Sequence, residues 1–230
     1  MSPRLAARLA GLFYLLEGLT SVFGQLIVPG MFLVTGDATA TASKILEQET
    51  LFRLGLTSAL LAVAFHLAQT VVFYVLFRPV SRVFALLLAS FALVAIALQA
   101  VSILFQLAPL VVLGARDLSA LGKEQLDALA LLFLKLRSQA FNVYLVFFGF
   151  RCLVLGYLIF KSIFMPRIIG VLMMFAGVGY LTLLWPPFAN AVAPFNLAIA
   201  APGELSIMLW LLVFGVNAER WREQARAAEV

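Results

Sequence analysis

Three ionisable side chains interrupt long apolar stretches of the sequence. They are Glu17 in "LAGLFYLLEGLTSVFG", His66 in "LLAVAFHLAQTVVF" and Arg151 in "VYLVFFGFRCLVLGYLIFK". A guanidinium keeps its proton in a protein, so Arg151 needs a buried partner or a polar cavity. A carboxylate is one such partner, and a carboxylate beside an imidazole can also transfer protons. The predicted chemistry is therefore ion pairing, binding of an anionic group, or acid/base work.

The three ionisable groups are expected at a similar depth along their apolar stretches. A helix rises about 1.5 Å per residue, and each group lies a similar distance from the basic residue at the nearer end of its stretch. We predict that Glu17 faces Arg151 in the interior, with His66 and Gln69 close by. A purely structural ion pair is the more conservative interpretation, because a buried charge needs a partner with or without a ligand. For one histidine, a neutral interior role is likewise the default.

Other polar residues recur at helical spacing inside the apolar stretches. Because polar groups facing lipid are costly, these stripes predict a polar-lined interior, which we expect to open towards the outside of the cell. Glu204 follows Pro202 at the start of the last stretch, where helix capping is the default role. The candidate residues of the binding site or buried polar network are Glu17, His66, Gln69, Gln99, Arg137, Tyr144, Arg151 and Glu204.

Several catalytic and binding motifs are absent from the sequence. One histidine and one cysteine exclude HExxH, any multi-histidine metal site and an intrachain disulfide. No GxSxG elbow or GxxxxGK[ST] phosphate loop occurs. No metal, cofactor or catalytic residue is therefore assigned. Basic residues fall in short runs between apolar stretches, which argues against nucleic-acid binding.

The composition is that of a multi-pass membrane protein. Of 230 residues, 64% are hydrophobic and only 12% are charged, against about half and a quarter in soluble domains. Runs of bilayer-spanning length predict an all-α bundle. We expect one transmembrane domain over residues 1–230, with about six spans near 9–29, 54–77, 83–107, 141–160, 168–185 and 202–216.

Segments outside these spans predict further features. Residues 36–55, with Asp37 as helix cap, and residues 116–137, which lead into the fourth span, are expected to form two short amphipathic helices on the outer side. Arginine and lysine are concentrated beside the termini and in the turns "FRPVSR" and "KSIFMPR", which predicts that both termini are cytoplasmic. Glycines seven residues apart in the first and fifth spans indicate close helix packing rather than an internal repeat.

The order of several segments resembles a known family. "RLAGLFYLLEG", "LFRPVSR", "VFFGFRCLVLGYLIFKSIFMPRIIGVLM" and "GELSIMLWLLVFGVN" follow one another as in the bacterial membrane family grouped as domain of unknown function 4386. The resemblance implies about six spans and a bacterial cytoplasmic membrane location, and it implies no activity. Histidines are common in that family where this chain has Arg137 and Arg151, so a histidine-dependent mechanism would not carry over.

Three classes of function remain open. Binding or transport of a small polar or amphipathic molecule through an outward-facing polar cavity accounts best for the polar stripes and Arg151. A structural or regulatory membrane partner protein is the second class, and small-residue faces would suit homo-oligomerisation. An intramembrane enzyme using Glu17 and His66 is the third. The expected partners are the lipid bilayer and a small-molecule or lipid ligand.

Overall fold

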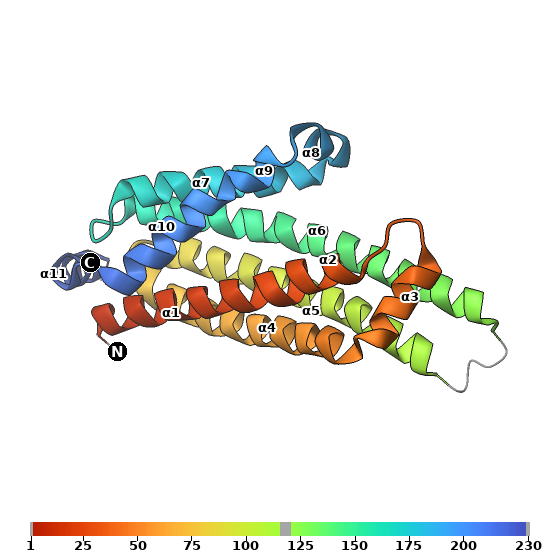
Figure 1. Cartoon of the computed structure of the whole chain (residues 1–230). Helices are drawn as coiled ribbons and strands as arrows, with labels where there is room; N and C mark the ends of the chain where they lie inside the picture. Colours follow the sequence, from red (N-terminus) through yellow and green to blue (C-terminus); the bar gives the residue numbers. More distant parts are fainter. Residues whose placement is uncertain (1, 116–120, 229–230) are drawn as a thin grey trace. The chain divides into compact units, whose positions relative to one another are not determined.

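A computed structural model describes residues 2–115 and 121–228. These residues form helices and connecting turns, with no strand among them (Figure 1). Six helical segments are long and apolar enough to cross a membrane: Pro3–Phe32, Glu49–Phe77, Arg82–Gly114, Lys123–Lys161, Arg167–Leu184 and Phe195–Val213. The predicted all-helical, six-span membrane protein is thereby confirmed.

The helices follow one another with short connections. The N-terminal half contains α1 (Pro3–Ser21), the π-helical segment η1 (Val22–Ile27), α2 (Val28–Phe32), α3 (Ala38–Glu47), α4 (Glu49–Phe77) and α5 (Arg82–Gly114). The C-terminal half contains α6 (Lys123–Lys161), α7 (Arg167–Leu181), the 3-10 turn η3 (Thr182–Leu184), α8 (Pro186–Val192), α9 (Phe195–Ala198), α10 (Ala200–Val213) and α11 (Ala218–Ala227).

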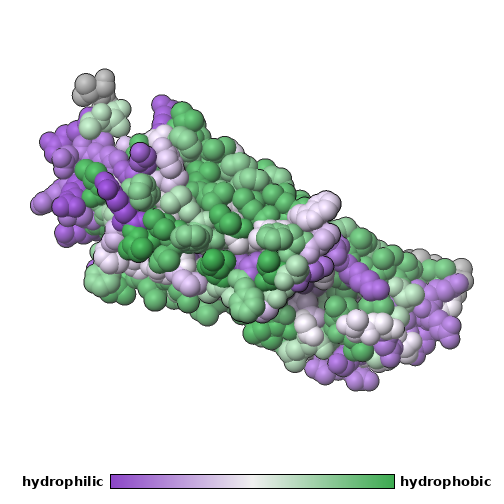
Figure 2. Space-filling model, turned by 90° about the horizontal axis from the view of Figure 1, so that it is seen from above, coloured by the Kyte–Doolittle hydropathy of each residue, from purple (hydrophilic) through white to green (hydrophobic). Residues whose placement is uncertain are grey.

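The surface matches a lipid environment. Many large apolar side chains are exposed, among them Leu60, Leu104, Val111 and Val178. Hydrophobic residues cover most of the face in Figure 2, and hydrophilic residues gather at both ends of that face. Exposed apolar area on this scale would be a liability in water and is expected against lipid tails.

The chain divides into two compact units. The first unit comprises Met1–Leu16, Phe65–Ile96 and Val143–Val230, and the second comprises Glu17–Ala64 and Ala97–Asn142. Helices α1, α4, α5 and α6 contribute residues to both units. The single transmembrane domain expected from the sequence stays a prediction.

In the first unit, glycines bring α6 and α7 into backbone contact. A Cβ on Gly170 would lie 2.6 Å from the carbonyl oxygen of Gly156, and one on Gly177 would lie 2.8 Å from that of Gly149. Such distances leave no room for a methyl group, so these positions require glycine. Helix α10 packs along α7 (Figure 1). The interpretation of the glycines as packing residues is confirmed for Gly170 and Gly177, and for Gly11 of the first span, where a Cβ would lie 2.8 Å from Leu212 N. It is wrong for Gly18, where a Cβ would meet nothing within 4 Å.

The second unit holds an apolar core around α2, α3 and α4. The core residues are Val28, Phe32, Ile45, Phe52, Leu56, Ala59, Ile103 and Leu134. Asp37 caps α3, as expected, because its Oδ1 accepts a hydrogen bond from Ala40 N at 2.8 Å. Residues 123–137 begin α6 and continue into the fourth span without a break. Residues 116–120 of the second expected amphipathic helix lie outside the described residues.

Candidate functional site

Arg151 lies in the C-terminal third of α6, within the first unit. Its side chain is the largest among the fully buried ones of the described residues. Gln69 of α4 accepts a hydrogen bond through Oε1 from Arg151 Nη2. The ring centroids of Phe148, Phe73 and Tyr14 lie 4.8, 5.6 and 5.7 Å from the guanidinium carbon. Helices α1, α4 and α6 thus surround the cation with an amide and three aromatic rings, whose faces attract positive charge.

Further predicted residues of the first unit gather around Phe148. The His66 ring lies 5.7 Å from the Phe148 ring, and the Tyr144 ring lies 5.6 Å from it. On the α7 side, Tyr180 meets Phe148 edge to face at 5.5 Å. The structure therefore brings His66, Gln69, Tyr144 and Arg151 into one cluster.

Glu204 reaches the same cluster through Tyr180. The Tyr180 hydroxyl donates a hydrogen bond to Glu204 Oε1. Helix α10 begins at Ala200, four residues before Glu204, and its N-terminus has no side-chain cap. Glu204 thus binds a neighbouring helix instead of filling the capping role that the sequence suggested.

The second unit contains a different polar arrangement, which begins with Pro29. Proline has no backbone N–H, so it cannot donate to the carbonyl four residues earlier, as in an α-helix, or five residues earlier, as in a π-helix. Those carbonyls belong to Gln25 and Gly24 in η1. Gln106 Nε2 donates to Gly24 O at 3.2 Å, and Arg137 Nη2 donates to Gln25 O. Two side chains therefore donate to the two carbonyls that a backbone N–H at position 29 could otherwise reach. Such bonds stabilise the helix in a membrane, because no water is available there to bind a free carbonyl.

A cavity of about 170 Å³ adjoins this arrangement. Its lining residues are Gln25, Leu26, Pro29, Gly30, Leu33, Leu134, Arg137 and Ser138. Arg137 is only 6% exposed and Gln25 is fully buried. Among the described residues, neither Arg137 Nε nor Gln25 Oε1 has a hydrogen-bond partner. Both atoms are themselves buried, so they lie within two of the lining residues but not on the cavity surface.

The remaining predicted residues belong to the second unit. Glu17 and Gln99 are buried there. Because Glu17 and Arg151 belong to different units, their pairing stays a prediction. Arg137 belongs to the second unit, whereas Tyr144 and Arg151 belong to the first. Within the described residues, no three His, Cys, Asp or Glu side chains form a group that could hold a metal ion.

Sequence reasoning missed Tyr180 and Phe148, as well as the role of Pro29. Phe148 follows Tyr144 by four residues, which places it on the polar face of its helix, whereas no such spacing marks Tyr180. Pro29 did carry a signal, because a proline inside an apolar span leaves a carbonyl in the preceding turn that needs another donor.

The comparisons with known proteins identify a family. The family model described as "Domain of unknown function (DUF4386)" matches residues 9–215. No curated protein and no solved structure matches the chain. The chain belongs to the DUF4386 family, as its segment order suggested. Since the family description assigns no activity, the function has to be argued from the site.

Proposed function

We propose that this DUF4386 membrane protein binds a small polar molecule, or the polar part of an amphipathic one, in the cavity beside Arg137. The observation that supports the proposal is the cavity of about 170 Å³ whose walls include the 6%-exposed Arg137. An unused donor on a buried cation costs free energy. A ligand oxygen that accepts from the Arg137 guanidinium would offset that cost.

The lining residues define the chemistry of the ligand. The Arg137 guanidinium favours an anionic or carbonyl oxygen, and the Gln25 side-chain amide favours a polar group. Leu26, Leu33 and Leu134 offer apolar walls for a short hydrocarbon portion. A volume of about 170 Å³ equals that of about six liquid water molecules, so the bound group is small.

The Arg151 cluster fits a structural role better than a ligand site. Gln69 and three aromatic rings contact its guanidinium. These contacts suit a structural role that stabilises a buried cation. We therefore propose that the ligand binds at Arg137 and that Arg151 has a structural role.

The proposal is tested by identifying what the purified protein carries. Ser138 lines the cavity, and its hydroxyl donates to Leu134 O at 3.1 Å. Ser138→Leu should fill the cavity without removing Arg137. We expect liquid chromatography and mass spectrometry of the denatured full-length protein to find one stoichiometric polar or amphipathic compound in the wild type, and at least tenfold less in Ser138→Leu and Arg137→Gln.

A matched serine provides the control. Ser90 is exposed, lies outside the cavity lining, and also donates to the carbonyl four residues earlier, Leu86 O, at 2.9 Å. Ser90→Leu should retain the compound at the wild-type level. Equal amounts in Ser138→Leu and wild type, or no stoichiometric compound in the wild type, would refute the proposal.

We further propose that the protein lies in a bacterial cytoplasmic membrane with both termini in the cytoplasm. The support is the concentration of basic residues beside the termini and the α4–α5 turn. In a Cys152→Ala background and intact cells, cysteines at Ser81 and Ala227 should resist an impermeant thiol reagent, and one at Gly122 should react. Labelling at Ser81 with protection at Gly122 would reverse the orientation.

A further inference from the structure

A second cavity lies at the end of the first unit where α4 turns into α5. Its volume is about 570 Å³, and its lining includes Tyr74, Arg78, Ser81, Arg82 and Trp221. Because α4 and α5 are both membrane-spanning segments, the turn that joins them belongs at a membrane surface. The cavity is therefore at the level of lipid headgroups.

Positive charge dominates the lining of this cavity. Arg78 and Arg82 are exposed, and none of the lining residues is acidic. Helix α5 begins at Arg82, and the Ser81 hydroxyl accepts from Phe84 N at 3.4 Å in its first turn. The N-terminal end of a long helix carries partial positive charge and free N–H groups, which favour an anion.

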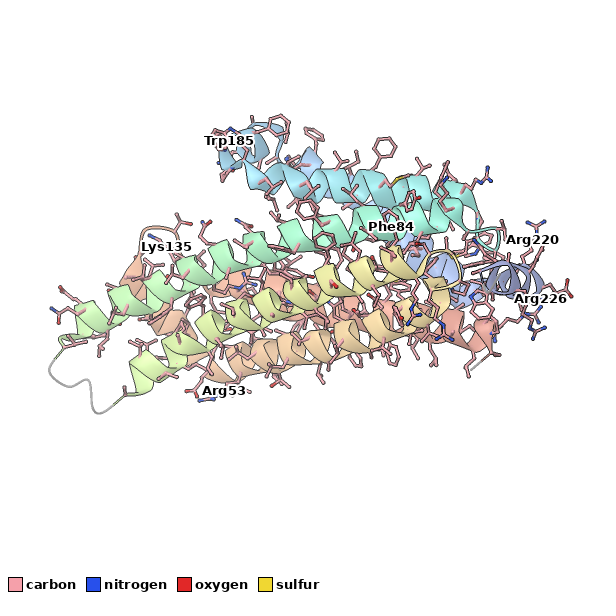
Figure 3. All side chains as sticks on the ribbon, turned by 180° about the vertical axis from the view of Figure 1, so that it is seen from behind. Arg53, Phe84, Lys135, Trp185, Arg220 and Arg226 are labelled. Carbon is pink, nitrogen blue, oxygen red and sulfur yellow. The ribbon has the colours of Figure 1, made fainter. Side chains whose placement is uncertain are left out.

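Helix α11 forms the opposite wall. Trp221 Nε1 donates to Leu76 O at 2.8 Å, which attaches α11 to the end of α4. Trp221, Ala225 and Ala228 contribute uncharged surface to the lining. The basic residues of α11, Arg220, Arg222 and Arg226, are exposed and lie outside the lining, as do its acidic residues, Glu219 and Glu223. Figure 3 shows Arg220 and Arg226 extending from α11.

Next to the basic residues, the first turns of α5 present apolar side chains. Val83 is 73% exposed, Leu86 49% and Leu87 38%. A phosphate at Arg78 and Arg82 would place an attached hydrocarbon chain beside these residues. A free anion would gain nothing from them, whereas a lipid would use both surfaces.

We propose that this cavity binds the phosphate-bearing headgroup of an anionic lipid, with the acyl chains lying along the exposed apolar face of α5. The arginines supply charge-assisted hydrogen bonds to phosphate oxygens. The aromatic rings of Tyr74 and Trp221 suit the interfacial depth. This site is separate from the Arg137 cavity, which belongs to the other unit, and does not depend on the function proposed there.

Native mass spectrometry of the full chain in mild detergent tests the proposal. Phosphatidylglycerol and phosphatidylcholine with identical acyl chains are added to the delipidated protein. We expect at least tenfold stronger retention of phosphatidylglycerol by the wild type, and loss of that preference in Arg78→Gln/Arg82→Gln. Arg78→Lys/Arg82→Lys keeps the charge and should keep most of the preference, which separates electrostatic binding from a change in fold.

The control removes the same charge elsewhere. Arg222→Gln/Arg226→Gln alters two exposed arginines outside the lining and should leave the preference unchanged. Displacement of the lipid by millimolar inorganic phosphate would assign the site to a free anion and overturn the lipid proposal. Equal retention of both lipids by the wild type, or an unchanged preference in Arg78→Gln/Arg82→Gln, would also overturn it.

Discussion

Replacing Gln69 by leucine should lower the free energy of unfolding by about 1.5–3 kcal/mol, because a buried charge loses a hydrogen bond of that strength. Gln69 Oε1 accepts from Arg151 Nη2, and both side chains are fully buried. Arg151→Met keeps the side-chain volume approximately and should destabilise similarly, since it leaves the Gln69 amide buried without that donor. Guanidinium chloride unfolding of the protein in detergent micelles provides the measurement.

The double variant identifies the origin of the loss. Gln69→Leu/Arg151→Met should be more stable than the sum of the single changes predicts, by at least about 1 kcal/mol, since an apolar pair tolerates burial. Arg167→Met is the control, because Arg167 is exposed on α7 and its guanidinium carbon lies 5.8 Å from the ring centroid of Phe160, which is also exposed. Arg167→Met should change the free energy of unfolding little, and its effect should be additive with that of Gln69→Leu. Strict additivity of the Gln69 and Arg151 changes would contradict the energetic link between them.

Gly170→Ala should destabilise the protein by about 2 kcal/mol or more, in the upper range of overpacking effects. The new Cβ would lie 2.6 Å from Gly156 O and 2.7 Å from Phe160 N, and both atoms are backbone atoms that cannot rotate away. Gly156→Ala should behave alike, with its Cβ 2.6 Å from Gly170 O. Both methyl groups enter the same α6–α7 contact. The double variant should therefore lose less free energy of unfolding than the sum of the losses in the two single variants.

Gly18 provides the control for these changes. It lies within α1, and a Cβ there would meet no atom within 4 Å. Gly18→Ala should therefore stabilise the protein by about 0.5–1 kcal/mol through helix propensity alone. Thermal unfolding followed by size-exclusion fluorescence compares the variants. Equal shifts for Gly18→Ala and Gly170→Ala would contradict the close approach of α6 and α7.

The number and approximate positions of the spans were predictable, because a bilayer-length apolar run is a direct signal of a helix in lipid. Helix ends were less predictable. The fourth span was expected at residues 141–160, whereas α6 runs from Lys123 to Lys161. The sequence "KEQLDALALLFLKLRSQA" contains good helix formers and no proline or glycine, so nothing ends the helix where the polar residues begin.

The environment of Arg151 could be predicted only in part. Its position in an apolar run required a compensating partner, and Gln69 at similar depth was a candidate. Phe73 and Phe148 were not singled out, although their spacing carries a signal: Phe73 follows Gln69 by four residues and Phe148 follows Tyr144 by four. That spacing places each ring on the polar face of its helix, but it does not show which residues of the other helices lie opposite.

The Arg137 cavity illustrates the same limit. Pro29 indicates that a carbonyl in the preceding turn needs a donor, and this can be read from the sequence. The donors come from Arg137 and Gln106, which lie 112 and 82 residues along the chain from the carbonyls they bind. Which polar side chain reaches which carbonyl depends on helix neighbours, and these are set by packing across the second unit.

An electron cryo-microscopy map of the full chain in lipid nanodiscs, with side chains resolved around η1 and α6, tests the central claim most directly. We predict connected non-protein density in the cavity, with an atom within about 3.2 Å of a nitrogen of the Arg137 guanidinium. Ser138→Leu should lack that density while the rest of the second unit stays unchanged. A cavity that contains only separate water peaks, or one closed by a protein group bound to Arg137 Nε, would contradict ligand binding at this site.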